Sequence, residues 1–210
     1  MKTMVITGGN GDIARAIKNE MEGEYIILTP GKEELDVTSI ESVNAFFEDK
    51  YVDILINNAG YVVPYSIKDC DIYSEKRAIE INLFGTFNCS AAVLKKNSSA
   101  QIINIGSSAA TKIHRTWSSY CASKAGVVMA TKCWADDGVN VVCVSPGRTA
   151  TKMRKGLFPT EDQDTLLKAE DFAKVARQAI EGKYNPGEHI NVNKDNVGEL
   201  LKWWKEKKLS

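Results

Sequence analysis

Between the first predicted strand and the first predicted helix, the chain reads Thr7-Gly8-Gly9-Asn10-Gly11-Asp12-Ile13-Ala14. Glycine adopts positive φ without strain and lets the backbone approach a ligand closely. The free N–H groups and the dipole of the following helix favour a phosphate at this place. The turn therefore indicates a dinucleotide site, although tight strand–helix turns also use glycine for purely steric reasons. No Gly-Lys-Ser/Thr closes it, so it is not a P-loop.

Short β-branched runs alternate with helical patterns along the rest of the chain. Strands are predicted at 4–7, 25–28, 53–57, 101–105 and 139–144, with a very short one at 34–36 and a weaker one at 189–192. Helices are predicted at 12–21, 39–50, 74–96, 118–135 and 170–181. Strands without a polar face that alternate with helices indicate a parallel sheet covered on both sides. We therefore expect one Rossmann-like, doubly wound α/β domain over 1–210 with about seven strands.

The composition excludes several classes of protein. Hydrophobic residues make up 43% of the 210 residues and charged residues 26%, as in a soluble globular domain. Lys plus Arg and Asp plus Glu number 27 each, so no bulk basic charge favours nucleic-acid binding. No apolar stretch approaches the roughly 20 residues of a membrane span, and the N-terminus lacks a signal-peptide pattern. The five cysteines include no CxxC pair and suit reduced thiols, which predicts a cytoplasmic protein. Taken together, these features predict no membrane partner, no nucleic-acid partner and no metal.

Polar residues follow several of the predicted strands. Asn57-Asn58-Ala59-Gly60 ends the strand at 53–57, and Ser107 and Ser108 follow the strand at 101–105. Tyr120 and Lys124 are spaced i, i+4, so they share one helix face. In doubly wound sheets, ligands bind outside the carboxyl ends of the strands, where these residues would lie.

In order and spacing, these residues resemble the short-chain dehydrogenase/reductase family from about Met4 to Val192. The matching signs are Thr7-Gly8, Asp36-Val37, Asn57 to Gly60, Asn82, Ser107 placed 13 residues before Tyr120, Lys124, and Pro146-Gly147 with Thr151. Two departures stand in the glycine turn, where Asp12 and Ala14 occupy positions of the family's later glycines. Cofactor affinity is what these two residues put in question.

The chemistry of such a site can be argued from the residues. Hydride transfer to or from a carbon that bears oxygen requires a proton to reach or leave that oxygen. A free tyrosine has a pKa of about 10, and an ammonium about 4 Å away favours the phenolate by up to ~4 kcal/mol. We therefore expect Tyr120 to be the acid/base, Lys124 to lower the pKa of Tyr120, and the Ser107 hydroxyl to polarise the substrate oxygen. The resemblance implies that Asn82 holds a water that links Lys124 to solvent.

The resemblance also implies a set of cofactor-binding residues. They are Thr7, Gly8, Gly9, Asn10, Gly11, Asp12, Ile13, Thr29, Asp36, Val37, Asn58, Ala59, Gly60, Tyr120, Lys124, Pro146, Gly147, Thr149 and Thr151. Structural alternatives stay open: Thr151 could be an ordinary helix N-cap, Asn82 a polar helix residue, and Ser108 a substitute for Ser107.

The second strand bears on the choice of cofactor. Enzymes that prefer NAD usually place a carboxylate at its end, which here reads Leu28-Thr29-Pro30-Gly31-Lys32 without an acid. Lys32 could reach a phosphate, which favours NADP(H) over NAD(H). Glu33 and Glu34 would weaken this inference if the loop folds back. Only seven residues separate Leu28 from Asp36, too few for a crossover helix.

The substrate end is less determined. The resemblance implies a substrate lid near 152–168, and Tyr61, His114, Trp117, Met153 and Phe158 could line the pocket. Arg148 and Arg154 favour either an anionic substrate or simple surface charge. The tail 196–210, with Trp203-Trp204, suits an amphipathic helix packed on the body or on a partner subunit, and a membrane-surface helix is the weaker alternative.

The sequence thus predicts an oxidoreductase that interconverts a small carbonyl compound and its alcohol with NAD(P)(H). The alternative is a regulatory protein that binds a dinucleotide and senses redox state without turnover. A sugar-nucleotide epimerase would need a C-terminal substrate domain, for which 210 residues leave no room. The resemblance further implies a homodimer or homotetramer built on the helices at 74–96 and 118–135, with Phe84 and Phe87 in or near the contact.

Overall fold

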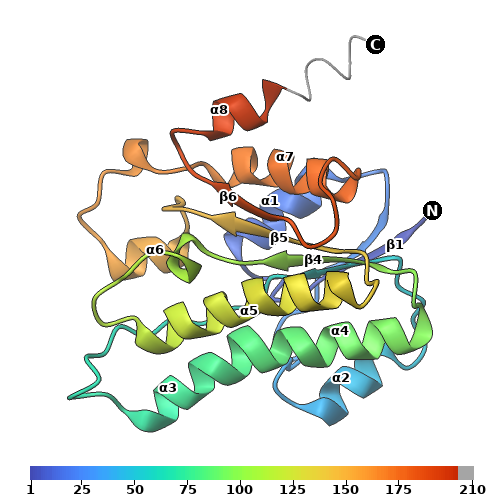
Figure 1. The fold of residues 1–210 in the computed structure, drawn as a ribbon, viewed down its shortest axis with the longest axis horizontal. Helices are drawn as coiled ribbons and strands as arrows, with labels where there is room; N and C mark the ends of the chain where they lie inside the picture. Colours follow the sequence, from blue (N-terminus) through green and yellow to red (C-terminus); the bar gives the residue numbers. More distant parts are fainter. Residues whose placement is uncertain (203–210) are drawn as a thin grey trace.

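The computed structural model describes residues 1–202 and contains a six-stranded parallel sheet in the order β2-β1-β3-β4-β5-β6 (Figure 1). The strands are β1 (Thr3–Ile6), β2 (Ile26–Leu28), β3 (Ile54–Asn57), β4 (Gln101–Ile105), β5 (Val141–Pro146) and β6 (His189–Val192). All of them run in one direction, so their carboxyl ends lie along a single edge of the sheet. The doubly wound α/β prediction is confirmed.

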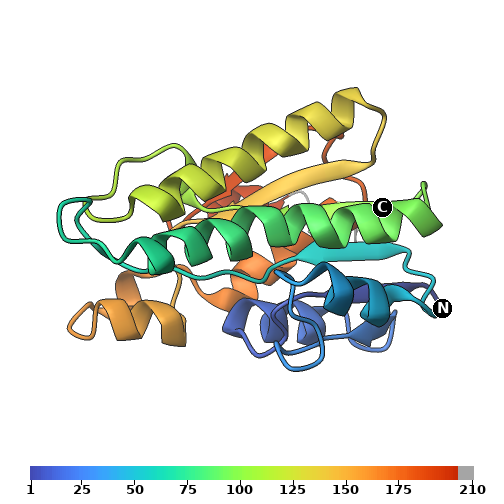
Figure 2. The same ribbon diagram turned by 90° about the horizontal axis from the view of Figure 1, so that it is seen from below.

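Helices cover both faces of the sheet, as the alternating pattern predicts (Figures 1 and 2). One face carries α1 (Asp12–Glu20), α7 (Ala169–Ile180) and the short α8 (Val197–Leu200). The other carries α2 (Ile40–Phe47), α4 (Gly85–Lys96) and α5 (Ser118–Asp136), with α3 (Ile72–Ile79) joined to α4 through a π-helical turn, η1 (Glu80–Phe84). The remaining short elements are η2 (Ser108–Ala110), α6 (Lys152–Leu157) and η3 (Gln163–Thr165).

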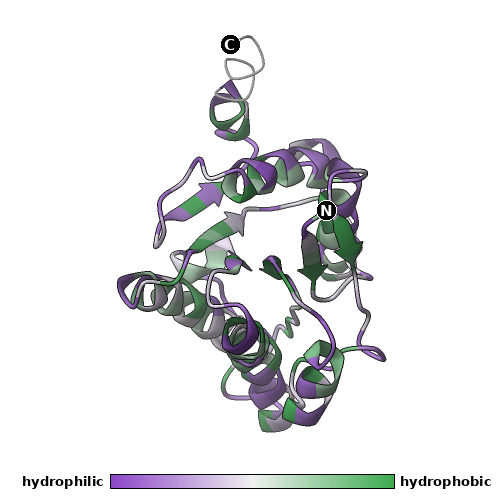
Figure 3. Cartoon of the chain, turned by 90° about the vertical axis from the view of Figure 1, so that its right-hand side faces the viewer, coloured by the Kyte–Doolittle hydropathy of each residue, from purple (hydrophilic) through white to green (hydrophobic). Residues whose placement is uncertain are grey.

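Each face of the sheet has its own apolar core. Phe172 of α7 is fully buried on the α1–α7 side, and Phe47 of α2 is 2% exposed on the α2–α4 side. Apolar residues concentrate on the strands, and polar residues on the outward turns of the helices (Figure 3). Burial of these side chains is the main source of stability, at about 1.5–3 kcal/mol for each large apolar group.

The predicted strand at 34–36 is wrong, and the sheet has six strands rather than seven. The N–H groups of Glu34 and Leu35 both donate to the carbonyl of Gly31, at 3.1 and 3.0 Å, so these residues form a tight turn. Asp36 Oδ1 accepts the Thr38 N–H at 3.0 Å. Since these bonds are satisfied locally, no strand is added outside β2, and β2 becomes the edge of the sheet.

A buried polar network ties the strands to the helices below them. Asn57 Nδ2 donates to Ser90 Oγ of α4 and to Asn104 Oδ1 of β4, both at 2.9 Å. Asn104 Nδ2 in turn donates to Thr131 Oγ1 of α5 at 2.9 Å. Buried hydrogen bonds between side chains of this kind help to specify one arrangement of a core. The network fixes α4 and α5 against the centre of the sheet, beside the residues of the candidate site.

The C-terminal region is described only in part. The predicted amphipathic tail over 196–210 begins with α8, which packs against α7, whereas Trp203 and Trp204 lie outside the described residues. Among residues 1–202, no helix has the length and the apolar character needed to cross a membrane.

Candidate active site

The glycine turn after β1 is pressed against the end of β3. Gly8 has a φ of +66°, and a Cβ atom on it would stand 2.9 Å from Ala59 Cα. A Cβ on Gly9 would overlap the carbonyl of Thr29. The Thr7 hydroxyl accepts the N–H groups of Asn58 and Ala59, each at 3.0 Å. Thr7, Gly8 and Gly9 thus hold the ends of β1, β2 and β3 together, and the turn stays open toward the crevice.

Neither departure from the family pattern blocks this turn. Ala14 is fully buried in the core under α1, so its methyl group points away from the crevice. The Asp12 carboxylate accepts the Lys152 N–H and an N–H of Arg15, both at 2.6 Å. Burial works to raise the pKa of Asp12, but these hydrogen bonds outweigh it and hold the pKa below its usual value. Asp12 therefore ties the turn to the first residue of α6.

A chain of connected cavities follows the carboxyl edge of the sheet. A central cavity of about 290 Å³ lies over the glycine turn, and an edge cavity of about 610 Å³ adjoins it near β2. Both touch Gly8, Ala59 and Gly60. A smaller pocket of about 110 Å³, the serine–tyrosine pocket, shares Tyr120 and Thr151 with the central cavity. This arrangement can hold an extended ligand with its reactive end at Tyr120.

Most of the predicted cofactor-binding residues line these cavities. The central cavity is lined by Gly8, Asn10, Gly11, Asp12, Ile13, Asn58, Ala59, Gly60, Tyr120, Lys124, Pro146 and Thr151. Asp36 and Val37 line the edge cavity, and Gly147 and Thr149 line the serine–tyrosine pocket. Thr7, Gly9, Thr29 and Asn82 line none of the three and instead support the walls.

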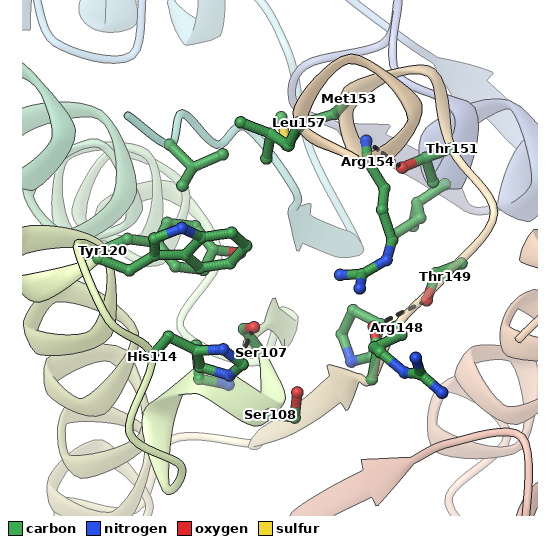
Figure 4. Close-up of a pocket in the computed structure, with 16 residues that line it drawn as sticks. Ser107, Ser108, His114, Tyr120, Arg148, Thr149, Thr151, Met153, Arg154 and Leu157 are labelled. Carbon is green, nitrogen blue, oxygen red and sulfur yellow. Dashed lines mark hydrogen bonds between the residues drawn. The ribbon is translucent and has the colours of Figure 1, made fainter. Parts of the chain in front are cut away.

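The serine, tyrosine and lysine converge where the central cavity meets the serine–tyrosine pocket. Ser107 follows β4, is 8% exposed, and accepts the Ala109 N–H at 3.1 Å as the N-cap of η2. Tyr120 and Lys124 share one face of α5, and the Lys124 ammonium lies 5.9 Å from the centre of the Tyr120 ring. Tyr120, Ser107 and His114 face Thr149, Thr151 and Arg154 across the pocket (Figure 4).

Burial dominates the electrostatics of this pair. Burial raises the pKa of Tyr120, and a hydrogen bond with Ser107 lowers it in part. Burial lowers the pKa of Lys124 to about 8. The Lys124 ammonium donates to the carbonyl of Ile105 at 2.8 Å. The pKa of Tyr120 is therefore shifted opposite to the direction expected from the sequence, because burial of the phenol disfavours its charged form.

Asn82 occupies the π-helical turn η1 and is fully buried. Its Oδ1 accepts the Tyr61 N–H and its Nδ2 donates to the Tyr61 carbonyl, both at 2.8 Å. A further bond runs from Nδ2 to Ser123 Oγ at 3.1 Å. Asn82 thus clamps the chain that follows Gly60 onto α5. π-Helical turns often mark functional sites, and this one places the Asn82 side chain against Tyr61 and Ser123.

The residues expected to line the substrate pocket are only partly those that the structure places there. Trp117 and Met153 line the serine–tyrosine pocket as expected, but Tyr61 lies on the edge cavity. Phe158 packs behind Trp117, with ring centres 6.0 Å apart. Sequence reasoning missed Ser123, although it stands beside Lys124 and one turn after Tyr120. It also missed Val62 and Leu157 as further pocket walls, for which no motif gave a signal.

The segment 152–168 folds over the site as α6, a turn and η3. Thr151 Oγ1 accepts the Arg154 N–H at 3.2 Å, so Thr151 is an N-cap as well as a cavity wall. The guanidinium of Arg154 binds Glu161 through Nε at 2.5 Å and Nη2 at 2.7 Å. These two bonds engage the Arg154 guanidinium inside the segment, and Glu161 also pairs with Arg148 at 3.2 Å. Residues 1–202 hold no cluster of His, Cys, Asp or Glu suited to a metal ion.

Comparison with known proteins agrees with this geometry. Residues 13–162 match the short chain dehydrogenase family. The chain belongs to that family. Its relatives include the 3-oxoacyl-[acyl-carrier-protein] reductase of Aquifex aeolicus, 31% identical over 203 residues that cover 90% of this chain and 77% of the relative. Membership makes the protein an oxidoreductase that uses NAD(P), and nothing in these relatives supports the regulatory alternative.

Solved structures share the short-chain dehydrogenase fold. The 3-ketoacyl-(acyl-carrier-protein) reductase of Brucella melitensis, complexed with NADH, superposes with a TM-score of 0.82 at 19% identity and covers 91% of this chain and 96% of its own. A small-chain dehydrogenase in complex with NADPH gives 0.81 at 23% identity, covering 96% of this chain and 100% of its own. Neighbours of this fold therefore bind either nicotinamide dinucleotide.

The tie between the turn and α6 can be tested directly. Asp12→Ala removes the acceptor of the Lys152 N–H, and we expect amide exchange over residues 151–157 to quicken about fivefold, because one hydrogen bond contributes roughly 1 kcal/mol. Hydrogen–deuterium exchange mass spectrometry measures this, with Asp136→Ala at the exposed end of α5 as the control. Unchanged exchange in the Asp12 variant would mean that other contacts hold the start of α6.

Proposed function

We propose that this short-chain dehydrogenase reduces a small carbonyl compound, or oxidises the matching alcohol, with Tyr120 as the acid/base. The convergence of Ser107, Tyr120 and Lys124 at the junction of the central cavity and the serine–tyrosine pocket supports this proposal. A bound nicotinamide dinucleotide supplies or accepts the hydride. Tyr120 donates a proton to the carbonyl oxygen during reduction and takes it back during oxidation, and the Ser107 hydroxyl binds the same oxygen.

The remaining residues of the site prepare this proton transfer. The Lys124 ammonium stabilises the phenolate that forms when Tyr120 gives up its proton. Asn82 holds the backbone of Tyr61, where the central and edge cavities meet. Gly60 lines the central and edge cavities beside these two residues, since a Cβ on it would stand 3.4 Å from Asn82 Oδ1 and 3.9 Å from Lys124 Nζ. In our proposal the glycine turn and the edge cavity hold the dinucleotide, Asn82 keeps the water relay, and 152–168 acts as the substrate lid.

We propose NADP(H) as the preferred cofactor. The loop after β2 does fold back, and Glu34 Oε2 accepts the Gly31 N–H at 3.0 Å, so a carboxylate stands beside the strand end. This carboxylate favours NAD(H), but the edge cavity is lined by three cations and two acids: Lys32, Lys76 and Arg77 with Asp36 and Glu80. The Lys32 ammonium lies 3.9 Å from Asp36 Oδ2, a loose pair that leaves it able to bind a phosphate. The positive balance of this cavity favours a ligand with a 2′-phosphate.

We also propose self-association and a cytoplasmic location. The helices α4 and α5 lie side by side (Figure 2). Phe84 and Met129 are 56% and 59% exposed, and Phe87 packs edge-on against Trp134, so this side of the molecule carries exposed apolar side chains. Phe84 is the last residue of η1, directly before α4. An exposed apolar surface of this kind is typical of a contact between subunits. The five cysteines are free thiols in the structure, as in proteins of reducing compartments.

The role of Tyr120 has a direct test. We expect Tyr120→Phe to lower kcat for carbonyl reduction by about 10²–10⁴-fold, because the proton donor is lost. NADPH binding, followed by nicotinamide fluorescence, should stay close to that of the native protein. Tyr51→Phe, at a 63% exposed tyrosine, is the control. Native-like turnover of any aldehyde or ketone by the Tyr120 variant would contradict the mechanism.

The pH dependence follows from the two buried groups. Reduction needs Lys124 charged, so kcat/KM for a carbonyl compound should fall as the pH rises past the lysine pKa of about 8. Oxidation needs the phenolate, so kcat/KM for the alcohol should rise throughout pH 7 to about 10, because the pKa of Tyr120 lies above its usual value. Lys124→Arg, which keeps its charge, should remove the fall in reduction. Reduction that stays constant past pH 9 in the native protein would rule out this role of Lys124.

The cofactor preference is tested by Lys32→Glu. We expect NADPH affinity to drop about tenfold or more, because a charge-assisted bond to the 2′-phosphate becomes a repulsion, while NADH affinity changes little. Fluorescence titration with both dinucleotides measures this, and Lys95→Glu on the exposed end of α4 is the control. Tighter binding of NADH than of NADPH by the native protein would overturn the preference.

The subunit contact is tested by Phe84→Asp. We expect the native protein to elute as a dimer or tetramer in size-exclusion chromatography with light scattering. A charge on this exposed apolar surface should shift the protein toward monomer, with Ile113→Asp, fully exposed on a loop away from α4, as the control. A native protein that is monomeric at micromolar concentration would contradict self-association.

A further inference from the structure

The serine–tyrosine pocket adjoins a further space, the distal cavity, of about 470 Å³. It lies beyond the carboxyl end of β6 and touches Asn191, Asn193 and Lys194. Ser108, His114, Gly147 and Arg148 line both the serine–tyrosine pocket and the distal cavity. A substrate whose carbonyl meets Ser107 and Tyr120 can therefore extend into the distal cavity.

The junction of the two spaces contains an unused polar atom. The Nε2 atom of His114 is buried and has no hydrogen-bond partner. The ring stacks on Trp117 with centres 5.1 Å apart, and Trp117 in turn meets the edge of the Tyr120 ring at 5.5 Å. Buried polar atoms normally have a partner, so this nitrogen leaves a hydrogen-bonding position unused beside both spaces that His114 lines. His114 thus points to a polar substrate that passes between the two spaces.

The charges around the distal cavity are mainly positive. Lys112, Arg148 and Lys194 line it against a single carboxylate, Asp195. Within the part of the chain that the structure describes, neither Lys112 nor Lys194 forms an ion pair. Arg148 shares Glu161 with Arg154, and its own bond to Glu161 is the longest of the three at 3.2 Å. These side chains are available to a ligand, whereas Arg154 is not.

We propose that the distal cavity binds an anionic group at the far end of the substrate, so that the enzyme acts on carbonyl compounds or alcohols that carry a carboxylate or a phosphate. The reacting oxygen binds Ser107 and Tyr120, the polar chain passes His114, and the anion lies between Lys112 and Lys194. This inference rests on the proposed function, because it uses the same position for the reacting carbon. Three cations against one carboxylate around the cavity favour an anionic substrate over a neutral one of the same shape.

The experiment compares matched anionic and neutral ligands. Its probes are 4-oxopentanoate, 5-oxohexanoate and 6-oxoheptanoate with their methyl esters, and dihydroxyacetone phosphate with dihydroxyacetone. Affinities are measured by ligand-observed NMR with oxidised NADP present, which cannot reduce these ketones. Because exposed ion pairs contribute up to about 1 kcal/mol each, we expect at least one anion to bind about fivefold more tightly than its neutral partner. The preference should weaken as salt is added.

Two variants locate the preference. In Lys112→Gln/Lys194→Gln, the ratio of anionic to neutral affinity should fall close to one. Lys95→Gln on α4, far from the cavity, should keep the native ratio. A preference for the oxo acids, for the phosphate or for both supports the proposal and identifies the anion.

Equal affinities within every pair, or a native ratio in the double variant, would overturn the anionic subsite. Neither result would touch the roles of Ser107 and Tyr120, which the Tyr120→Phe measurement tests separately. Conversely, a native-like Tyr120→Phe enzyme would remove the proposed chemistry, and the affinity ratios would still decide whether the distal cavity binds anions.

Discussion

The close contact between the β1–α1 turn and the end of β3 is the constraint on which the site depends. Gly8 lies so near Ala59 that a Cβ would stand 2.9 Å from its Cα, and the Thr7 hydroxyl accepts two N–H groups from the β3 end. These bonds satisfy backbone groups that would otherwise point unpaired into the crevice. The crevice therefore has a fixed floor, and the cavities that run from the edge of β2 to Tyr120 follow from it.

Burial of Tyr120 and Lys124 is the second determinant. Moving an ammonium and a phenol out of water disfavours their charged forms, which lowers the pKa of Lys124 and raises that of Tyr120. The Lys124 ammonium nevertheless has a buried hydrogen-bond partner, the Ile105 carbonyl at 2.8 Å. In the mechanism we propose, a neutral phenol at Tyr120 suits proton donation to a carbonyl oxygen at neutral pH.

Local chemistry explains what the sequence could predict. The glycine turn, the Tyr120–Lys124 spacing and the alternation of strands with helices depend on near neighbours in the chain, and the structure brings them together as expected. The prediction of a strand at 34–36 was wrong because the Gly31 carbonyl accepts the N–H groups of Glu34 and Leu35, which form a turn. The Glu34 bond to Gly31 and the direction of the Tyr120 pKa shift required side-chain positions and burial, which periodicity does not encode.

Asp12 shows the same limit in a contact that spans 140 residues of the chain. From the sequence it is an acid where a glycine is expected, close to the place for a pyrophosphate, and so it threatens cofactor binding. In the structure its two oxygens are engaged by Arg15 and by the Lys152 N–H, which directs the carboxylate toward α6. Ala14 faces the core. The added acid therefore does not point freely into the crevice, and it links the turn to α6 at the start of the segment that we propose as the substrate lid.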